Sequence, residues 1–338
     1  MEQVTHMQYA LRTLNRTRRR RGPLFVSLPV SCLPKWLSFV MAALCLAGMA
    51  DPARALLAGA YPDTPAARVD RNSTASLWAG VGSITYNGGT YTGTLIGRRH
   101  VLTAAHAVPV DPAGMGVLFN LNYGADLSHR IPVLRVHKHP HFVGFNTPNL
   151  NDDIAVLELA HDVPVGVPIY GLSAEPLLPG TELTLVGYGA SGNGSTGISI
   201  ERNPAVKRVG RNSADAFVTD DEGSGENELY LFDFDGEPGS SNFLGGKSLG
   251  NEIETTFASG DSGSPAFVRE GGGWKIAGVN TYVQFFPQGM RTMGRFGTGG
   301  GGQIVRAYRA WILQIMSGDE PAGQAAAAVS GRAPSSGQ

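Results

Sequence analysis

The chain has 338 residues, of which 42% are hydrophobic, 16% are charged and 46 are glycine. This composition is typical of a globular, loop-rich protein, and the length suffices for one large domain or two smaller ones. Beyond residue 55, nineteen Lys and Arg residues stand against twenty-six Asp and Glu residues, a net charge of −7. A mildly acidic body without a basic stripe argues against nucleic acid as a partner.

The first 55 residues are typical of a secretory leader. Arginines cluster at residues 16–21, an apolar run follows at residues 36–49, and Ala53 and Ala55 form an A-x-A cleavage pattern. The apolar run is shorter than the ~20 residues that a transmembrane helix needs. We therefore expect a secreted protein, extracellular or periplasmic, with no stable membrane span after leader removal. Both cysteines lie in this leader, so the mature chain has no disulfide.

Short apolar runs separated by turn residues follow an N-terminal extension at residues 56–74. Asn87 and Gly88 separate two of these runs and predict a β-hairpin. Runs at this spacing are typical of an all-β barrel or sandwich. Further strands are expected at residues 131–137, 153–159, 182–189, 228–234 and 274–283.

A proline-rich connector at residues 161–180 divides the predicted strands into two sets. This division predicts two β-barrels, at residues 75–172 and 173–304. Apolar residues at helical spacing then predict a helix at residues 305–316. The small and polar residues 317–338 are expected to form a disordered tail.

The stretch GDSG at residues 260–263 makes a poor helix or strand, because glycine weakens both. A serine hydroxyl attacks a carbonyl only with a base in hydrogen-bond reach, a group that holds this base, and donors for the oxyanion. Glycines let the backbone turn so that the amides of Gly260 and Ser262 can point at one spot. The candidate base is His106 and the candidate orienting acid is Asp153. Taken singly, the default interpretations are a structural histidine and an ordinary turn residue.

Three motifs taken together favour a catalytic role over these default interpretations. LTAAH, DIAVLEL and GDSGSP occur in this order, and their residues His106, Asp153 and Ser262 are spaced by 47 and 109 positions. At these motifs the sequence closely resembles the trypsin/chymotrypsin family of serine endopeptidases, especially its secreted bacterial members. The resemblance extends over roughly residues 75–316, with a poorly matched middle at residues 190–250.

The resemblance implies two six-stranded antiparallel β-barrels with a C-terminal helix and an active site between the barrels. Ser262 would attack the scissile carbonyl, while His106 would take its proton and return it to the leaving amine. The acid that directly precedes an Ile-Ala pair is Asp153, not the adjacent Asp152, and it would orient the histidine. The amides of Gly260 and Ser262 would bind the oxyanion. The implied enzyme is a monomer that acts on proteins or peptides without a cofactor or metal ion.

Other site residues follow from the same resemblance. Thr281 takes the place of a family serine that supports the catalytic acid. Thr256 stands six residues before the serine, where trypsin-like members carry an acid, and Val283 replaces a glycine at the pocket mouth. These two residues predict a narrow, uncharged specificity pocket for small or medium apolar side chains. Glu254 lies close to Thr256 in the sequence, so a one-residue gap in the match to the family would change which residue is assigned to the specificity pocket.

The sequence departs from the family at its activation signal and beside the histidine. Ala107 stands where a cysteine is usual, so packing must hold this loop. Cleavage between Arg68 and Val69 would give a new N-terminus able to pair with Asp261, but the glycines that should follow are absent. The interpretation we favour is an internal partner for Asp261 and no zymogen step.

Two further patterns could bind metal ions. His137, His139 and His141 alternate and would share one face of a strand, but a His-Pro turn belongs to the family resemblance, so no metal is expected. Acidic stretches at residues 219–228 and 233–237 carry the oxygen ligands that calcium prefers. They fit no EF-hand loop and are expected to be solvated surface loops.

The glycines at residues 297–302 match G-x-G-x-x-G but lack the βαβ context of a dinucleotide site, so a flexible loop bordering the pocket is expected. Two alternatives to a protease stay open. One is a catalytically silent module that binds proteins or peptides through the same cleft. The other is an esterase-like hydrolase with the same acyl-enzyme chemistry.

Overall fold

The computed structural model describes residues 56–144, 150–236, 241–286 and 290–318. Every described residue belongs to one compact unit, residues 53–338. The leader predicted at residues 1–55, and all but the first two residues of the predicted tail, lie outside the described residues. Among the described residues, no helix combines the length and apolar character needed to cross a bilayer.

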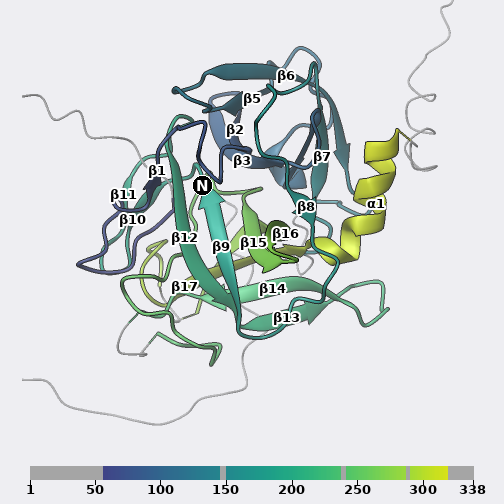
Figure 1. Ribbon diagram of the computed structural model, residues 1–338. Coiled ribbons are helices and arrows are strands. Elements are labelled where there is room, and N and C mark those ends of the chain that lie inside the picture. The colour runs from purple at the N-terminus through teal and green to yellow at the C-terminus, as the bar shows by residue number, and fades with distance from the viewer. Residues whose placement is uncertain (1–55, 145–149, 237–240, 287–289, 319–338) are drawn as a thin grey trace, which may run out of the picture. The chain divides into compact units, whose positions relative to one another are not determined.

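The first half of the described chain forms a closed, six-stranded antiparallel barrel (Figure 1). The strands are neighbours in the order β2-β3-β4-β7-β6-β5, and β5 pairs with β2 to close the ring. Buried side chains such as Leu95, Phe119 and Leu157 fill the interior. The barrel strands are β2 (Val81–Tyr86), β3 (Gly89–Leu95), β4 (His100–Thr103), β5 (Leu118–Leu121), β6 (His129–Lys138) and β7 (Ala155–Leu159).

A two-residue turn joins β2 to β3, as the Asn-Gly pair predicts. Tyr86 and Gly89 are paired at the ends of the two strands, and Asn87 and Gly88 between them have φ angles of 46° and 71°. Positive φ at both central positions defines the type I′ turn, whose twist matches that of the strands. The hairpin is therefore fixed by local sequence.

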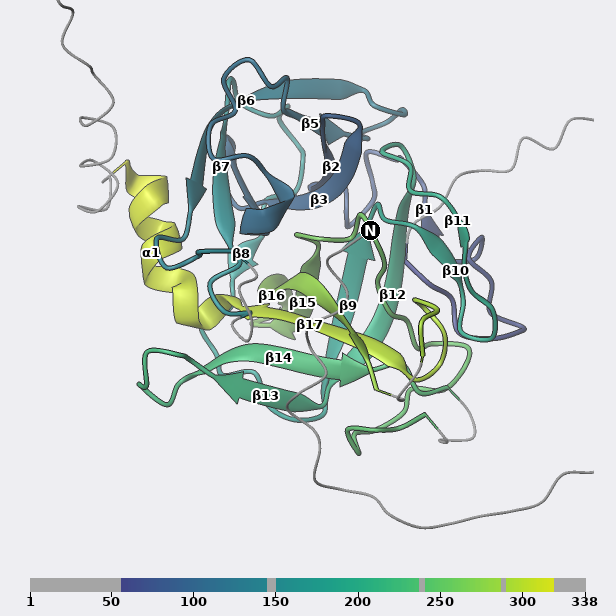
Figure 2. The ribbon, with the colours of Figure 1, turned by 180° about the vertical axis from the view of Figure 1, so that it is seen from behind.

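The second half forms a nine-stranded sheet, which lies below the barrel in Figure 2. Its order is β1-β12-β9-β15-β16-β17-β14-β13, and β8 (Gly171–Leu172) pairs in parallel with β16. A separate hairpin joins β10 (Ser191–Asn193) to β11 (Gly197–Ile200). The other strands are β1 (Val69–Asp70), β9 (Thr181–Gly187), β12 (Lys207–Ala214), β13 (Ala216–Thr219), β14 (Asn227–Asp233), β15 (Pro265–Glu270), β16 (Gly273–Phe285) and β17 (Thr298–Ile304).

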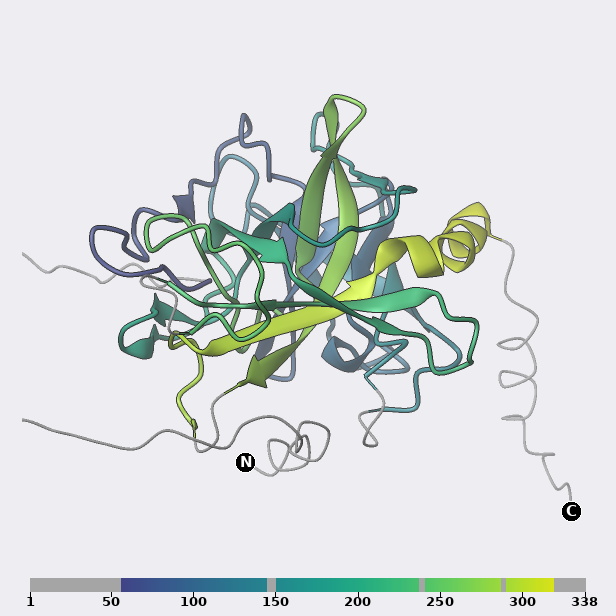
Figure 3. The ribbon, with the colours of Figure 1, turned by 90° about the horizontal axis from the view of Figure 1, so that it is seen from below.

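The helix α1 (Val305–Ser317) continues directly from β17, as Figure 3 shows, and packs against β8, β14 and β16. Its apolar face joins a core cluster that also contains Leu102 of the barrel and Val186 and Phe267 of the sheet. This cluster fastens the two halves together and so fixes the loops that meet between them. The buried helix residues are Val305, Tyr308, Ile312 and Ile315.

The predicted all-β fold with a C-terminal helix is confirmed. The first half closes as a six-stranded barrel, whereas the second half has nine strands instead of six because β1 and β13 extend its two edges and β8 pairs with β16. The domain boundaries drawn from the sequence stay predictions.

The glycine run at residues 297–302 is not the flexible loop that the sequence predicted. Residues 298–304 form β17, which is fully buried between β14 and β16. A Cβ on Gly302 would lie 1.8 Å from the Val279 carbonyl oxygen, and a Cβ on Gly300 would lie 2.3 Å from the Phe257 ring. The glycines are therefore needed because neighbouring atoms leave no room for side chains.

Candidate active site

The three residues of the predicted triad lie within hydrogen-bond reach of one another. His106 Nδ1 is 2.6 Å from Asp153 Oδ2, and His106 Nε2 is 2.8 Å from Ser262 Oγ. The second oxygen of Asp153 accepts a hydrogen bond from the His106 backbone N–H at 2.8 Å. The Asp153 side chain is fully buried and that of His106 is 21% exposed. The acid is thus shielded from water, while the imidazole keeps one open side.

Each of these residues stands just outside a strand. His106 lies in η1, a short 3-10 turn (Ala105–Ala107) after β4, and Asp153 lies two residues before β7. Ser262 precedes β15 in the second half. Ala105 packs into the barrel interior and Ala107 into the cluster between the halves, so packing holds the histidine turn where the family has a disulfide.

The backbone around Ser262 turns in a way that only glycine allows. Gly260 and Gly263 have φ angles of 100° and 82°, in the left-handed region that disfavours side chains. A Cβ on Gly263 would lie 2.0 Å from the Thr103 hydroxyl oxygen. The Ser262 carbonyl accepts a hydrogen bond from the Thr92 amide at 3.0 Å. Within the described chain, the amides of Gly260 and Ser262 donate no hydrogen bond, so both remain available as oxyanion donors.

Asp261 has internal partners, as we favoured from the sequence. Its carboxylate accepts hydrogen bonds from the amides of Gly189 at 2.8 Å and Ala258 at 3.0 Å. Burial raises the pKa of Asp261 to about 7, while these amides, the charge of Arg208 and a hydrogen bond from the Leu56 backbone N–H act in the opposite direction. The contact with Leu56 was missed from the sequence, although Leu56 directly follows the A-x-A pattern of the leader.

The bond between Arg68 and Val69 is a poor position for activating cleavage. Val69 is paired with Arg208 in the strand β1, and Arg68 is buried. The Arg68 guanidinium forms an ion pair with Asp63 at 2.5 Å and donates a hydrogen bond to the Glu254 carbonyl at 2.9 Å. A protease would have to unfold this edge before it could reach the bond.

The residues predicted to support the acid and to shape the pocket have other surroundings. Thr281 lies at a bulge in β16, where its hydroxyl accepts a hydrogen bond from Gln303 at 3.3 Å, and in the described chain it makes none to Asp153. Thr256 is fully buried, and its hydroxyl has no partner among the described residues. Val283 is partly buried and packs against the core of the second half. The support expected from Thr281 is therefore not made.

The three histidines do not share a face. Because β6 ends at Lys138, the alternation stops after His137, which pairs with Glu158 at 2.8 Å. His139 instead lies 2.8 Å from Asp152, and His141 lies 2.5 Å from Glu222. Asp152, the acid that the family pattern passed over, thus faces His139 rather than His106.

The two acidic stretches differ in exposure. In the first stretch, residues 221–227 are exposed, as expected for a surface loop, but its last acid, Glu228, is buried. Asp233 and Asp235 are buried together with Glu254, so the prediction of a solvated loop at residues 233–237 is wrong for these two acids. The Asp235 amide donates a hydrogen bond to Glu254 at 3.1 Å, and burial together with a side-chain hydrogen bond to Asp235 raises the pKa of Glu254 well above its usual range.

Comparisons with known proteins agree with the fold. The family model described as Trypsin matches residues 70–224, a range that includes His106 and Asp153 and ends before Ser262. A similar solved structure is neuropsin, a serine protease expressed in the limbic system of mouse brain, with 17% sequence identity and a TM-score of 0.50. The similarity covers 71% of this chain and 95% of that one. No curated protein matches the chain.

The fold is trypsin-like, and residues 70–224 are similar to the Trypsin family model. The match over residues 70–224 agrees with the resemblance that the motifs predicted. The closer resemblance to secreted bacterial members of the trypsin/chymotrypsin family stays a prediction.

Proposed function

We propose that the protein is a secreted serine endopeptidase that hydrolyses peptide bonds through an acyl-enzyme intermediate. One observation carries this proposal: a continuous chain of hydrogen-bond contacts runs from buried Asp153 through His106 to Ser262, with distances of 2.6 and 2.8 Å. A module that only binds peptides has no use for this arrangement.

The residues would act in a fixed order. As Ser262 Oγ attacks the scissile carbonyl carbon, His106 Nε2 takes the hydroxyl proton, and the resulting oxyanion binds to the amides of Gly260 and Ser262. The intermediate then expels the amine, which leaves with the proton from His106. A water molecule attacks the acyl-enzyme by the same route. Both oxygens of Asp153 hold the histidine, one through Nδ1 and one through its backbone N–H, so the ring keeps the tautomer that accepts a proton at Nε2.

We also infer that leader removal activates the enzyme, in place of the interpretation without a zymogen step that we favoured from the sequence. Cleavage after Ala55 would make Leu56 the N-terminus, and the Leu56 nitrogen already contacts Asp261 next to the nucleophile. An α-amino group has a pKa near 8 and is largely charged at neutral pH. The amide contact would then become an ion pair with Asp261, which would hold the carboxylate charged and stabilise the turn that carries the oxyanion donors.

For specificity, we keep the proposal of an uncharged pocket near Thr256 and Val283 that takes small or medium apolar side chains. Cleavage of a peptide library tests it, and strict cutting after Lys or Arg would contradict it. The substrate class is protein or peptide, and the active species is a monomer.

A serine-directed fluorophosphonate probe tests the enzyme proposal. The mature protein is expected to be labelled and to cleave casein, and Ser262→Ala is expected to lose labelling and to lower turnover by at least ~10⁴-fold. Ser259→Ala is the matched control, because Ser259 is exposed and three residues away, and it should keep full activity. An unlabelled protein would indicate the binding module, and labelling with turnover of simple esters alone would indicate the esterase.

A further inference from the structure

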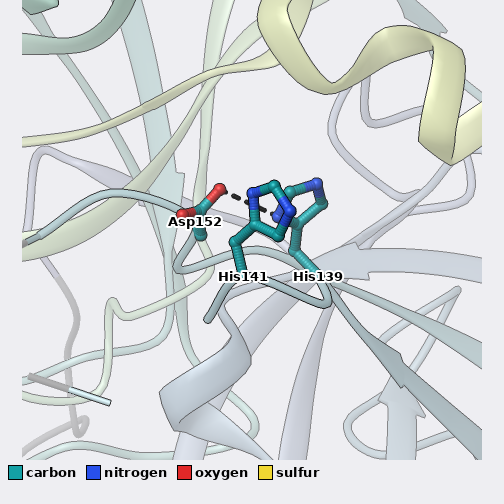
Figure 4. Close-up of side chains that lie close together, drawn as sticks. All are labelled: His139, His141 and Asp152. Carbon is teal, nitrogen blue, oxygen red and sulfur yellow. Dashed lines mark ion pairs between the residues drawn. The ribbon is translucent and has the colours of Figure 1, made fainter. Parts of the chain in front are cut away.

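We propose that His139, His141 and Asp152 bind one divalent transition-metal ion, most readily Zn²⁺, in a site next to the triad (Figure 4). One ligand atom from each residue lies within 4.8 Å of the others. His139 Nδ1 and Asp152 Oδ1 are 2.8 Å apart. Neighbouring ligands that each lie about 2.0–2.1 Å from one ion are roughly 2.8–3.4 Å apart. Small movements of the His141 side chain would complete such a set.

The strongest reason for an ion is the state of Asp152. Its side chain is 2% exposed, and in the described chain neither carboxylate oxygen accepts a hydrogen bond. His139 Nδ1 lies 2.8 Å from Asp152 Oδ1 and forms an ion pair with it when the imidazole is protonated, but the geometry of the two groups makes no hydrogen bond. A buried carboxylate without hydrogen bonds is costly, and such groups are usually paired or ligate metals. A cation between Asp152 and His139 would satisfy both groups.

The backbone of Asp152 adopts an uncommon conformation and is held in it by a hydrogen bond. Its φ angle is 62°, in the left-handed region that is uncommon for residues with a Cβ, although Asp adopts it more often than most. Its amide donates a hydrogen bond to the Tyr308 hydroxyl at 3.0 Å, which ties it to the helix α1. Strained backbone of this kind is concentrated at functional sites. The carboxylate is therefore presented in a fixed direction, as a metal ligand must be.

A second loop contributes acids to the same site. Glu222 lies between β13 and β14, and its Oε1 is 2.5 Å from His141 Nδ1. Asp152, Asp221 and Glu222 form a further group whose ligand oxygens all lie within 4.8 Å of one another. The His141 side chain is 58% exposed, so an ion can reach the site from solvent. A carboxylate in this position can orient the histidine or supply a fourth ligand.

The nitrogen and oxygen ligand atoms of the site favour particular metal ions. Two imidazoles with carboxylate oxygens suit Zn²⁺ and its neighbours, whereas Ca²⁺ and Mg²⁺ prefer oxygen ligands alone. An ion here would join the loop after β6 to the loop between β13 and β14, and would fix the residue that directly precedes Asp153. We therefore expect binding to stabilise the protein by mass action.

Calorimetric titration of the metal-free Ser262→Ala protein with Zn²⁺ tests the site and avoids self-digestion. We expect about one ion per chain and much weaker binding of Ca²⁺. His141→Ala should weaken Zn²⁺ binding at least 10-fold, because it removes one of three ligands. His161→Ala is the control, since His161 is exposed and outside the cluster, and it should bind as the parent does. Equal losses in both variants, or no saturable binding, would overturn the proposal.

Two further measurements keep the result independent of folding defects. Co²⁺ bound to the parent should give visible absorption bands typical of nitrogen and oxygen ligation, and these bands should be absent from the His141→Ala protein. Zn²⁺ should raise the Tm of the parent and of His161→Ala but not that of His141→Ala. A Tm increase of equal size in all three proteins would show that the ion binds elsewhere.

Discussion

Glu254 is a buried carboxyl group whose proton links stability to pH. Burial, together with hydrogen bonding to Asp235, raises the pKa of Glu254 well above its usual range of about 4.3. Between that value and the raised one, the folded protein holds a proton that the unfolded chain has released. Raising the pH therefore favours the unfolded chain, by up to about 1.4 kcal/mol per pH unit for one such group.

We predict that Glu254→Gln makes the Tm less dependent on pH between pH 5 and 8. Glutamine keeps the shape and a donor group but has no proton to lose. The measurement is thermal unfolding over this pH range, with Glu252→Gln as the control because Glu252 is exposed and close in sequence. A Tm slope unchanged from the parent would show that Glu254 is already ionised in the folded protein.

Among single residues, the sequence predicted those whose roles follow from short local motifs. His106, Asp153 and Ser262 stand in short patterns, and the structure brings these three side chains together. The environment of Thr281 could not be predicted, because a bulge in β16 shifts the register there and turns its hydroxyl toward Gln303.

Among the elements, β17 has an unusual sequence for a buried strand, because four of its seven residues are glycine. Four successive glycines, residues 299–302, lie between β14 and β16, where neighbouring atoms occupy the space of every Cβ. Glycine normally weakens a strand, so this element depends on its two neighbours rather than on its own propensity.

We predict that Gly302→Ala lowers the free energy of unfolding by about 3 kcal/mol, because the added methyl group would collide with the Val279 carbonyl. Gly273→Ala in the adjacent strand β16 is the control, since its nearest neighbouring atom would lie 3.9 Å away, and it should change stability by less than about 0.5 kcal/mol. Urea unfolding measures both variants. Similar stability of the two would mean that β17 can shift to make room.

The strands with continuous apolar runs were predicted within a few residues, because a largely buried strand leaves a short apolar run between turn residues in the sequence. The glycine strand left no such pattern, since close packing rather than hydrophobicity selects its residues. The histidine alternation failed for a related reason. The end of β6 at Lys138 depends on the following His-Pro turn, not on the spacing of the histidines.

In the whole molecule, the segment that follows the leader belongs to the fold of the second half. Leu56 and Leu57 are fully buried, and the Leu57 amide donates a hydrogen bond to the Thr256 carbonyl at 3.0 Å. Residues 56–74 are therefore not a loose extension. The sequence could not indicate this, because the partners lie some 200 positions away.

We predict that the secreted, active enzyme begins at Leu56, which N-terminal sequencing would show. A protein prepared with one extra residue before Leu56 should have a kcat/KM lower by roughly 10²–10³-fold, because loss of a buried ion pair costs about 3–5 kcal/mol. An extra residue at the C-terminus is the control and should have no effect. Equal activity of the extended and authentic forms would show that amide contacts alone hold Asp261.

The histidine turn, clamped by Ala105 and Ala107, has a practical consequence. No thiol or disulfide contributes to residues 56–338, because this range contains no cysteine. Reducing agents such as dithiothreitol therefore have nothing to attack, and the protein can be produced in a bacterial cytosol. Extracellular relatives that rely on cross-links would lose their shape under the same treatment.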